Sequence, residues 1–193
     1  FRRVLFRSLK SEIARVLGRG PVEDGFLLNR KLIWMGRWIR RGYYPVKLLR
    51  LFRRGRGRCE DRTVNEHIVV DGVLGRLRGD IIHEDRKSLS SWINKQCVYA
   101  ELEAQELRKS QGLGEVQGDL FSSSASRKRW LRDHVYNRLP PVTRAVMFFL
   151  YRYVVRGGFL DGREALVFHV VNALWVPLIA DALFLETDRG ERD

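Results

Sequence analysis

Hydrophobic positions follow a helical period in two stretches of the chain. In residues 9–18 the apolar side chains fall at positions 9, 13, 16 and 17. From Ser88 to about Lys109, apolar residues recur every three or four positions. These spacings predict a short helix that ends at Gly18 or Gly20, and a long amphipathic helix with Ser88 as its N-cap.

Between these helices the chain has the composition of β-strands. Residues 25–33 are rich in β-formers and aliphatic residues, and we expect a strand there. Residues 48–54 also predict a strand. Simple alternation would place Leu49 and Leu51 on one face of the sheet, and Arg50 and Phe52 on the other.

Two further strands are expected around a tight turn. Residues 64–70 and residues 73–83 are apolar runs separated by Asp71 and Gly72. Because Asp-Gly between two apolar runs favours a two-residue turn, we expect these strands to pair as a hairpin. The second strand would end at His83.

The C-terminal third has a different pattern. Residues 110–125 are rich in Gly, Ser and Gln and predict a linker, followed by a helical region over 126–193. Residues 165–185 are nearly all apolar and just long enough to span a bilayer. Burying Asp181 in lipid is costly, so a helix lying in the membrane interface fits better. The alternative is a buried helical hairpin that packs on the main domain.

Composition adds a strong positive charge. Lys and Arg number 36 against 23 acidic residues, which gives a net charge of +13. This excess indicates an anionic partner, either nucleic acid, anionic lipid or a phosphorylated substrate, or else a solvated basic surface. The two cysteines, Cys59 and Cys97, have no zinc-site spacing.

The first eight residues do not fit the rest of the pattern. FRRVLFRS alternates Arg and Phe, and it has neither a helix cap nor the order of a signal peptide. We interpret residues 1–8 as a non-native scar outside the fold. On this interpretation, the native protein continues upstream.

One carboxylate is a candidate general base. Glu66 lies between Asn65 and His67 and interrupts an apolar strand, as expected of a residue that faces a cleft or a solvent edge. A semi-enclosed carboxylate can deprotonate a hydroxyl group. The structural alternative is an ion pair of Glu66 with Arg50 or Arg62.

Other side chains are candidate ligands. His83, at a strand end, is a tentative metal or phosphate ligand. Arg50 and Arg53 are candidates for binding phosphate or a charged acceptor, with plain surface arginines as the alternative. Trp38 and Tyr44, in a Gly/Pro-containing segment, could stack on sugar rings or bases, or simply cover the edge of the sheet.

The order of these motifs resembles the C-terminal half of bacterial family 2 glycosyltransferases of the lipopolysaccharide-core and capsule type. One departure from the family pattern is Asn65, where a His is usual beside Glu66. A second is the lack of an Asp-x-Asp motif before the first helix. The matching positions are 36–39, 42–45, 50–54, 64–66, His83, Ser88, Leu89, Lys95, Tyr99, Glu103, Ala104 and 153–162.

The resemblance implies a fold and an architecture. The fold would be α/β, with residues 9–109 as the acceptor side of a Rossmann-like GT-A domain that includes the β-hairpin. Residues 110–125 would be a linker, and residues 126–193 a mostly helical, membrane-associating tail. The nucleotide-binding half would lie upstream, so the 193-residue chain alone is expected to be inactive.

The resemblance also implies a reaction. The full enzyme would transfer a sugar, with inversion, from a nucleotide-sugar to a lipid-linked or lipopolysaccharide-type glycan, with Mg or Mn on the diphosphate. Glu66 would be the general base and His83 a tentative metal ligand. Trp38, Tyr44, Arg50 and Arg53 would bind the acceptor at the cytoplasmic face of the inner membrane. The positive charge would attract anionic lipid and phosphorylated glycan, and nucleic acid would not be a partner.

Two functions from other classes remain open at this stage. Basic residues interleaved with aromatics also suit a nucleic-acid-binding module, although no helix-turn-helix, RNP or zinc-finger pattern occurs. A non-catalytic membrane-surface module would use the same charge and the apolar tail. Salt-dependent binding to DNA or RNA would favour the first of these.

Overall fold

The computed structural model describes residues 2–5, 7–59, 68–84, 86–112 and 139–190. The chain divides into two compact units, each described by itself below. The sheet unit comprises Phe1–Ser88 and Arg152–Phe168, and the helical unit comprises Leu89–Tyr151 and His169–Asp193.

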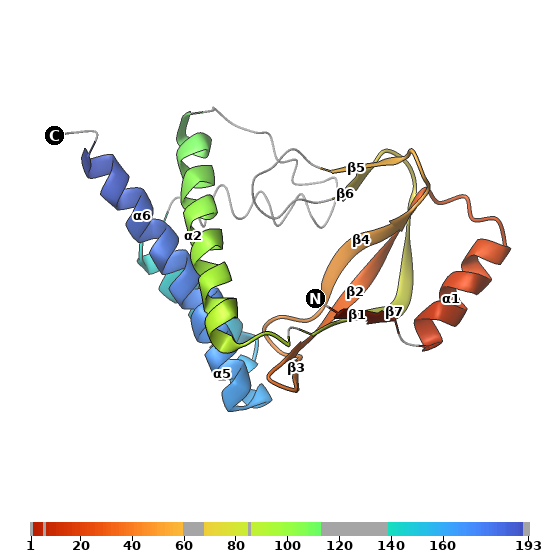
Figure 1. Ribbon diagram of the computed structural model, residues 1–193, viewed down its shortest axis with the longest axis horizontal. Coiled ribbons are helices and arrows are strands. Elements are labelled where there is room, and N and C mark those ends of the chain that lie inside the picture. Colours follow the sequence, from red (N-terminus) through yellow and green to blue (C-terminus); the bar gives the residue numbers. More distant parts are fainter. Residues whose placement is uncertain (1, 6, 60–67, 85, 113–138, 191–193) are drawn as a thin grey trace. The chain divides into compact units, whose positions relative to one another are not determined.

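The sheet unit is built around β2 (Gly25–Trp34), as Figure 1 shows. On one side, β7 (Leu74–Glu84) runs parallel to β2. On the other side, β4 (Val46–Phe52) pairs with the first part of β2 and β3 (Arg37–Ile39) with its last part, both antiparallel. The strand β1 (Arg2–Leu5) pairs with the outer edge of β7. The result is a mixed five-stranded sheet.

A helix covers one face of this sheet. The helix α1 (Arg7–Gly18) packs against β2 and β7 in a core that contains Leu9, Phe26, Leu28, Leu77 and Ile81. Leu9 is fully buried in it.

The contact between α1 and β7 depends on an irregular stretch of strand. Leu27 pairs with Arg76 but Asn29 with Asp80, so β7 carries extra residues there. The carboxylate of Glu12 accepts hydrogen bonds from the N–H groups of Arg78 and Gly79, both at 2.9 Å. These bonds satisfy amides that the irregular pairing would leave open.

The helical unit is formed by long helices. The helix α2 (Leu89–Gly112) lies beside α6 (Val176–Gly190), and their contact uses Ala100, Val176 and Ala180. Small alanines let the two helices approach closely. Among the described residues, the helical unit also contains α4 (Thr143–Leu150) and a π-helical turn at Val170–Trp175. The sheet unit contains a 3-10 turn at Gly158–Asp161, and also nearly all of a π-helical turn at Tyr151–Val155 and of α5 (Arg163–His169).

A buried ion pair lies inside the helical unit. Asp181 on α6 is 1% exposed and Arg144 on α4 is 5% exposed. The Nε of Arg144 donates to Asp181 Oδ1 at 2.8 Å, and its Nη2 donates to the same oxygen. The backbone N–H of Val142 donates to Asp181 Oδ2 at 2.9 Å. Val142 has a φ of 70°, which is strained for a β-branched residue, and the bond to Asp181 helps to hold it there.

The sequence-based expectations of secondary structure are largely confirmed. A mixture of helices and strands compatible with an α/β class is present. The expected helices over 9–18 and 88–109 appear as α1 and α2, and the strands over 25–33 and 48–54 as β2 and β4. Residues 113–138, which include most of the expected linker and the start of the expected helical region, lie outside the described residues.

Two expectations about the strands were wrong. The turn at Asp71 and Gly72 does not form a hairpin, because β6 (Ile68–Val70) pairs with β5 (Gly57–Cys59) whereas β7 pairs with β2. The simple alternation in β4 also fails. Leu51 pairs with Phe26 and Leu49 with Leu27, which places Arg50 in a β-bulge and the two leucines on opposite faces.

Most of the residues in 1–8 that were excluded from the predicted fold form part of the sheet unit. Arg2–Leu5 form the edge strand β1, and α1 begins at Arg7. The edge of β7 thereby gains a hydrogen-bonded partner.

The apolar C-terminal stretch is helical. Arg163–Thr187 is long and apolar enough to cross a membrane, with a mean hydropathy of 1.8, judged by length and composition alone. The same test is passed by core helices of soluble proteins. Asp181, which argued against a span, is paired with Arg144 within the helical unit.

Candidate functional site

Two aromatic rings pack together near the C-terminal end of β2. Trp38 on β3 and Tyr44 in the following turn meet edge to face, with ring centroids 5.4 Å apart. Gly42, with a φ of 72°, turns the chain back so that Tyr44 can reach Trp38. The Tyr44 N–H donates to the carbonyl of Arg40 at 3.2 Å and closes the turn.

A carboxylate on β7 completes this group. The hydroxyl of Tyr44 donates to Asp80 Oδ1 at 3.1 Å. Asn29 on β2 pairs with Asp80 in the register of the sheet, and its side chain also hydrogen-bonds to the Tyr44 hydroxyl. Desolvation by burial, followed by the bond to Asp80, raises the pKa of Tyr44. The hydroxyl is therefore neutral at physiological pH and can act as a donor.

Two cations lie over the indole ring. The Nζ of Lys31 is 4.2 Å from the centroid of Trp38, and the guanidinium carbon of Arg40 is 5.4 Å from it. Such contacts are attractive because the π face of an indole carries negative potential. We call Asn29, Lys31, Trp38, Tyr44 and Asp80 the sheet-face site.

On the opposite face of β2, aromatic and arginine side chains pack against one another. The ring of Tyr43 meets Phe168 at 5.3 Å, and Trp34 meets Phe168 at 6.0 Å. Arg30 and Arg152 lie 5.3 and 5.2 Å from the centroid of Tyr43. Burial lowers the pKa of Arg152 to about 10, so it stays charged at neutral pH. Burial also raises the pKa of Tyr43, against the opposing effect of the arginines.

A second carboxylate fixes the end of β3. Asp161 is buried, and its Oδ2 accepts hydrogen bonds from the backbone N–H groups of Arg40 at 2.6 Å and Arg41 at 2.5 Å. The guanidinium of Arg41 also donates to Asp161 Oδ1 at 3.4 Å. The backbone that carries Trp38 into the sheet-face site is thus held in place by the segment that contains Asp161.

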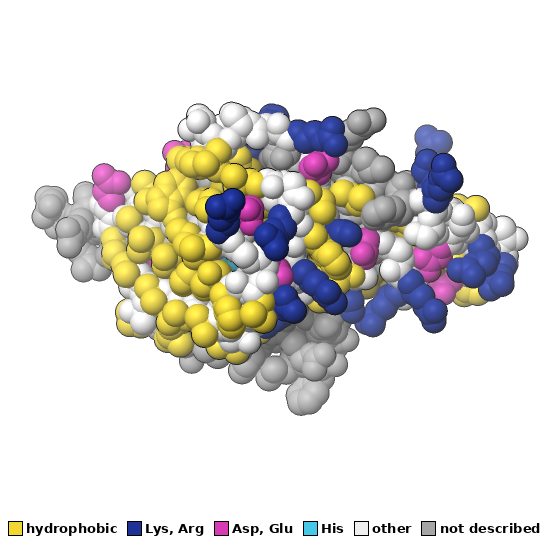
Figure 2. Space-filling model, turned by 90° about the horizontal axis from the view of Figure 1, so that it is seen from below, with side chains coloured by type: hydrophobic (Ala, Val, Ile, Leu, Met, Phe, Trp, Pro, Cys, Tyr) yellow, Lys and Arg dark blue, Asp and Glu magenta, His cyan; other side chains and the backbone are white. Residues whose placement is uncertain are grey.

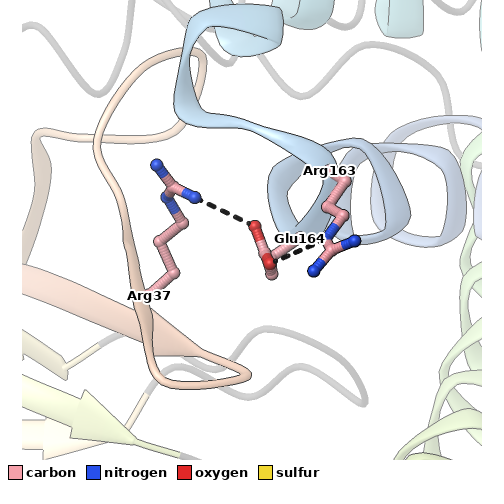
Figure 3. A network of polar contacts seen from close by, with 3 residues as sticks. All are labelled: Arg37, Arg163 and Glu164. Carbon is pink, nitrogen blue, oxygen red and sulfur yellow. Dashed lines mark hydrogen bonds and ion pairs between the residues drawn. The ribbon is translucent and has the colours of Figure 1, made fainter.

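A surface carboxylate supports the same strand (Figure 3). Glu164 contacts Arg37 on β3 at 3.2 Å and Arg163 at 3.4 Å. A hydrogen bond from its own backbone amide is the main cause that lowers the pKa of Glu164. Hydrogen bonds from the two arginines act in the same direction, against the opposing effect of desolvation.

This contact should make a small, pH-dependent contribution to stability. A carboxylate with a lowered pKa in the folded state stabilises the protein above its ordinary pKa of 4.5 and loses this effect as the pH falls through the folded-state value. We expect Glu164→Gln to melt below the wild type at neutral pH, with the difference vanishing in acid. Thermal unfolding across this pH range checks it, and a difference independent of pH would contradict the assignment.

The structure brings together only some of the residues predicted from the sequence. Trp38 and Tyr44 are in contact. Arg50 lies at the bulge of β4, and Arg53 donates to the carbonyl of Pro21. His83 pairs with Leu32 and, three residues beyond Asp80 along β7, points to the opposite face of the sheet.

The structure does not test the roles predicted for Glu66 as general base and for His83 as metal ligand. Glu66 lies outside the described residues. Among the residues that the structure does describe, no group of three His, Cys, Asp or Glu side chains could hold a metal ion. His83 would therefore supply a single ligand from the described residues.

Sequence reasoning missed three members of the sheet-face site, namely Asn29, Lys31 and Asp80. Asp80 precedes the apolar pair Ile81 and Ile82 in a strand, and a lone carboxylate there was an available signal. No protein-family model matches the chain, and no solved structure is significantly similar to it.

Proposed function

We propose that the chain is the acceptor-binding part of an inverting family 2 glycosyltransferase of the GT-A class. The sheet-face site carries this proposal, because Trp38, Tyr44 and Asp80 lie together in it. Trp38 and Tyr44 also belong to the ordered motifs that resemble this family. An aromatic ring beside a carboxylate suits a sugar, which has apolar C–H faces and a rim of hydroxyl groups.

Each member of the site has a part in binding the acceptor. The indole of Trp38 packs against the apolar face of the acceptor ring. Asp80 accepts a hydrogen bond from a sugar hydroxyl, and Tyr44, whose hydroxyl donates to Asp80, orients that carboxylate. Lys31 and Arg40 attract the phosphate groups of a lipopolysaccharide-type acceptor. Arg50 and Arg53 bind charged groups further along the glycan.

Glu66 supplies the chemistry in this proposal. Its carboxylate takes the proton of the acceptor hydroxyl, and the hydroxyl oxygen attacks the anomeric carbon of the donor sugar. The bond from that carbon to the nucleotide diphosphate breaks, the diphosphate leaves with the electron pair, and the configuration inverts. The nucleotide-binding half of the enzyme would bring the Mg or Mn that neutralises the diphosphate, with His83 as one ligand.

The proposed location is the cytoplasmic face of the inner membrane. The net charge of +13 and the apolar helical run Arg163–Thr187 support it. A peripheral or monotopic enzyme there would meet lipid-linked acceptors.

The test is sugar transfer by the chain joined to an upstream nucleotide-binding half. The assay supplies nucleotide-sugars and lipopolysaccharide acceptors from membrane extract. We expect Glu66→Gln to lower turnover by roughly 10²–10⁴-fold, the usual contribution of a general base.

The matched control for this assay is Glu101→Gln, an exposed glutamate on α2. It removes the same charge and should leave turnover unchanged. Unchanged turnover in folded Glu66→Gln would place the base elsewhere and leave Glu66 as an ion-pair partner.

A further inference from the structure

A short turn in the sheet unit carries four exposed hydrophobic side chains. Val154, Val155, Phe159 and Leu160 are 52%, 74%, 50% and 56% exposed. Exposed apolar residues that cluster in this way mark an interaction surface more often than scattered single residues do. We call residues 154–160 the apolar turn.

The apolar turn has a defined backbone. The N–H of Gly157 donates to the carbonyl of Val154, and the N–H of Leu160 donates to the carbonyl of Gly157, both at 3.0 Å. Gly157 has a φ of 68°, which a side chain would strain. Asp161, directly after the turn, holds the amides of Arg40 and Arg41. The exposed hydrophobic side chains are therefore presented by a fixed element of the sheet unit.

Arginines accompany the turn. Arg156 lies within it, and Arg163, whose side chain is 93% exposed, follows it. A Cβ placed on Gly157 would lie 3.5 Å from the Cδ of Arg41, so this third arginine lies beside the turn. Apolar side chains with a basic margin match the interface of an anionic bilayer, where hydrocarbon lies below negative headgroups.

Two observations favour a bilayer over an apolar groove on another protein. The chain continues from the turn directly into Arg163–Thr187, the helical run that is apolar enough to cross a membrane. The net charge of +13 complements an anionic surface. Figure 2 shows one face of the molecule, on which hydrophobic side chains (yellow) and Lys and Arg side chains (dark blue) are both exposed.

We infer that residues 154–160 insert into the headgroup region of an anionic lipid bilayer. This inference deepens the membrane association in the proposed function and does not depend on sugar transfer. Asp161 ties the turn to the backbone after β3, the strand that carries Trp38. Insertion would therefore hold the sheet-face site at a fixed depth relative to the membrane, where a lipid-linked acceptor is found.

The test uses an environment-sensitive fluorophore on a single cysteine. In the full chain with Cys59→Ser and Cys97→Ser, the label is placed at Val155→Cys or, as a control, at Val22→Cys. Val22 is 81% exposed and lies in the connection between α1 and β2. With vesicles of phosphatidylcholine and phosphatidylglycerol, we expect the emission at position 155 to shift to the blue and to lose quenching by aqueous iodide. The label at position 22 should show no blue shift and should remain quenched by iodide.

Two pairs of substitutions distinguish the contribution of the apolar side chains to vesicle binding from that of the arginines. Val155→Asp with Leu160→Asp should lower vesicle affinity about tenfold or more. The reason is that charges replace two aliphatic side chains that would insert into the bilayer. Arg156→Gln with Arg163→Gln should weaken binding to anionic vesicles severalfold and leave binding to pure phosphatidylcholine unchanged.

Either of two results overturns the inference. One is a label at position 155 that stays as quenchable as at position 22 while the chain is bound to vesicles. The other is a chain that binds no vesicles. Neither readout involves a nucleotide-sugar, so failure here is distinct from failure of the transferase proposal.

Discussion

Replacing Asp161 by alanine is expected to lower the free energy of unfolding of the sheet unit by about 2–5 kcal/mol. The carboxylate accepts hydrogen bonds from two backbone amides, those of Arg40 and Arg41, and from the Arg41 guanidinium. Alanine would leave both amides without this acceptor. The end of β3 would loosen, and with it the position of Trp38 in the sheet-face site. Urea unfolding of the variant and the wild type measures the loss.

Asparagine provides the matched control at this position. Asp161→Asn keeps one carbonyl oxygen that can still accept from the backbone amides, but it loses the negative charge. We expect a loss smaller than that of Asp161→Ala. Equal losses would mean that the charge, and not the bonds to the two amides, stabilises this segment.

Removing one partner of the buried ion pair should have the second large effect. Arg144→Met would leave the carboxylate of Asp181 buried without its cation, which costs about 3–5 kcal/mol in comparable cases. Asp181 is 1% exposed, so water cannot replace the guanidinium without opening the helical unit. Thermal and urea unfolding followed by helical circular dichroism measure the effect.

The double variant distinguishes a buried charge from lost packing. Arg144→Met with Asp181→Leu removes both charges and fills the space with apolar atoms. We expect it to be more stable than Arg144→Met alone. It will still fall below the wild type, because the N–H of Val142 loses its acceptor. A double variant no more stable than the single one would show that packing dominates.

Local signals were enough to place most helices and strands. The periodic spacing of residues 9–18 and of residues 88–109 is encoded within a few neighbouring positions, so α1 and α2 could be predicted. The Asp71-Gly72 pair marked the break between β6 and β7. It could not show which strands pair, because pairing depends on residues far away in sequence.

The misses share a physical cause. The bulge at Arg50 arises from the register between β4 and β2, which no pattern within β4 reveals. Asp80 meets Tyr44 across 36 positions, and Asp161 meets Arg41 across 120. Such contacts depend on the assembled sheet unit. Only residue types that already suggest binding, such as Trp38 and Tyr44, were accessible from the sequence.

The most direct test of the account is glycan binding at the sheet-face site. Calorimetric titration of the chain with lipopolysaccharide core oligosaccharide compares the wild type with Trp38→Ala, and with Trp175→Phe in the helical unit as control. Losing one aromatic stacking contact should weaken binding by about tenfold or more for Trp38→Ala and leave Trp175→Phe unchanged. No glycan binding by the folded wild type, together with tight, salt-dependent binding of RNA or DNA, would contradict the account.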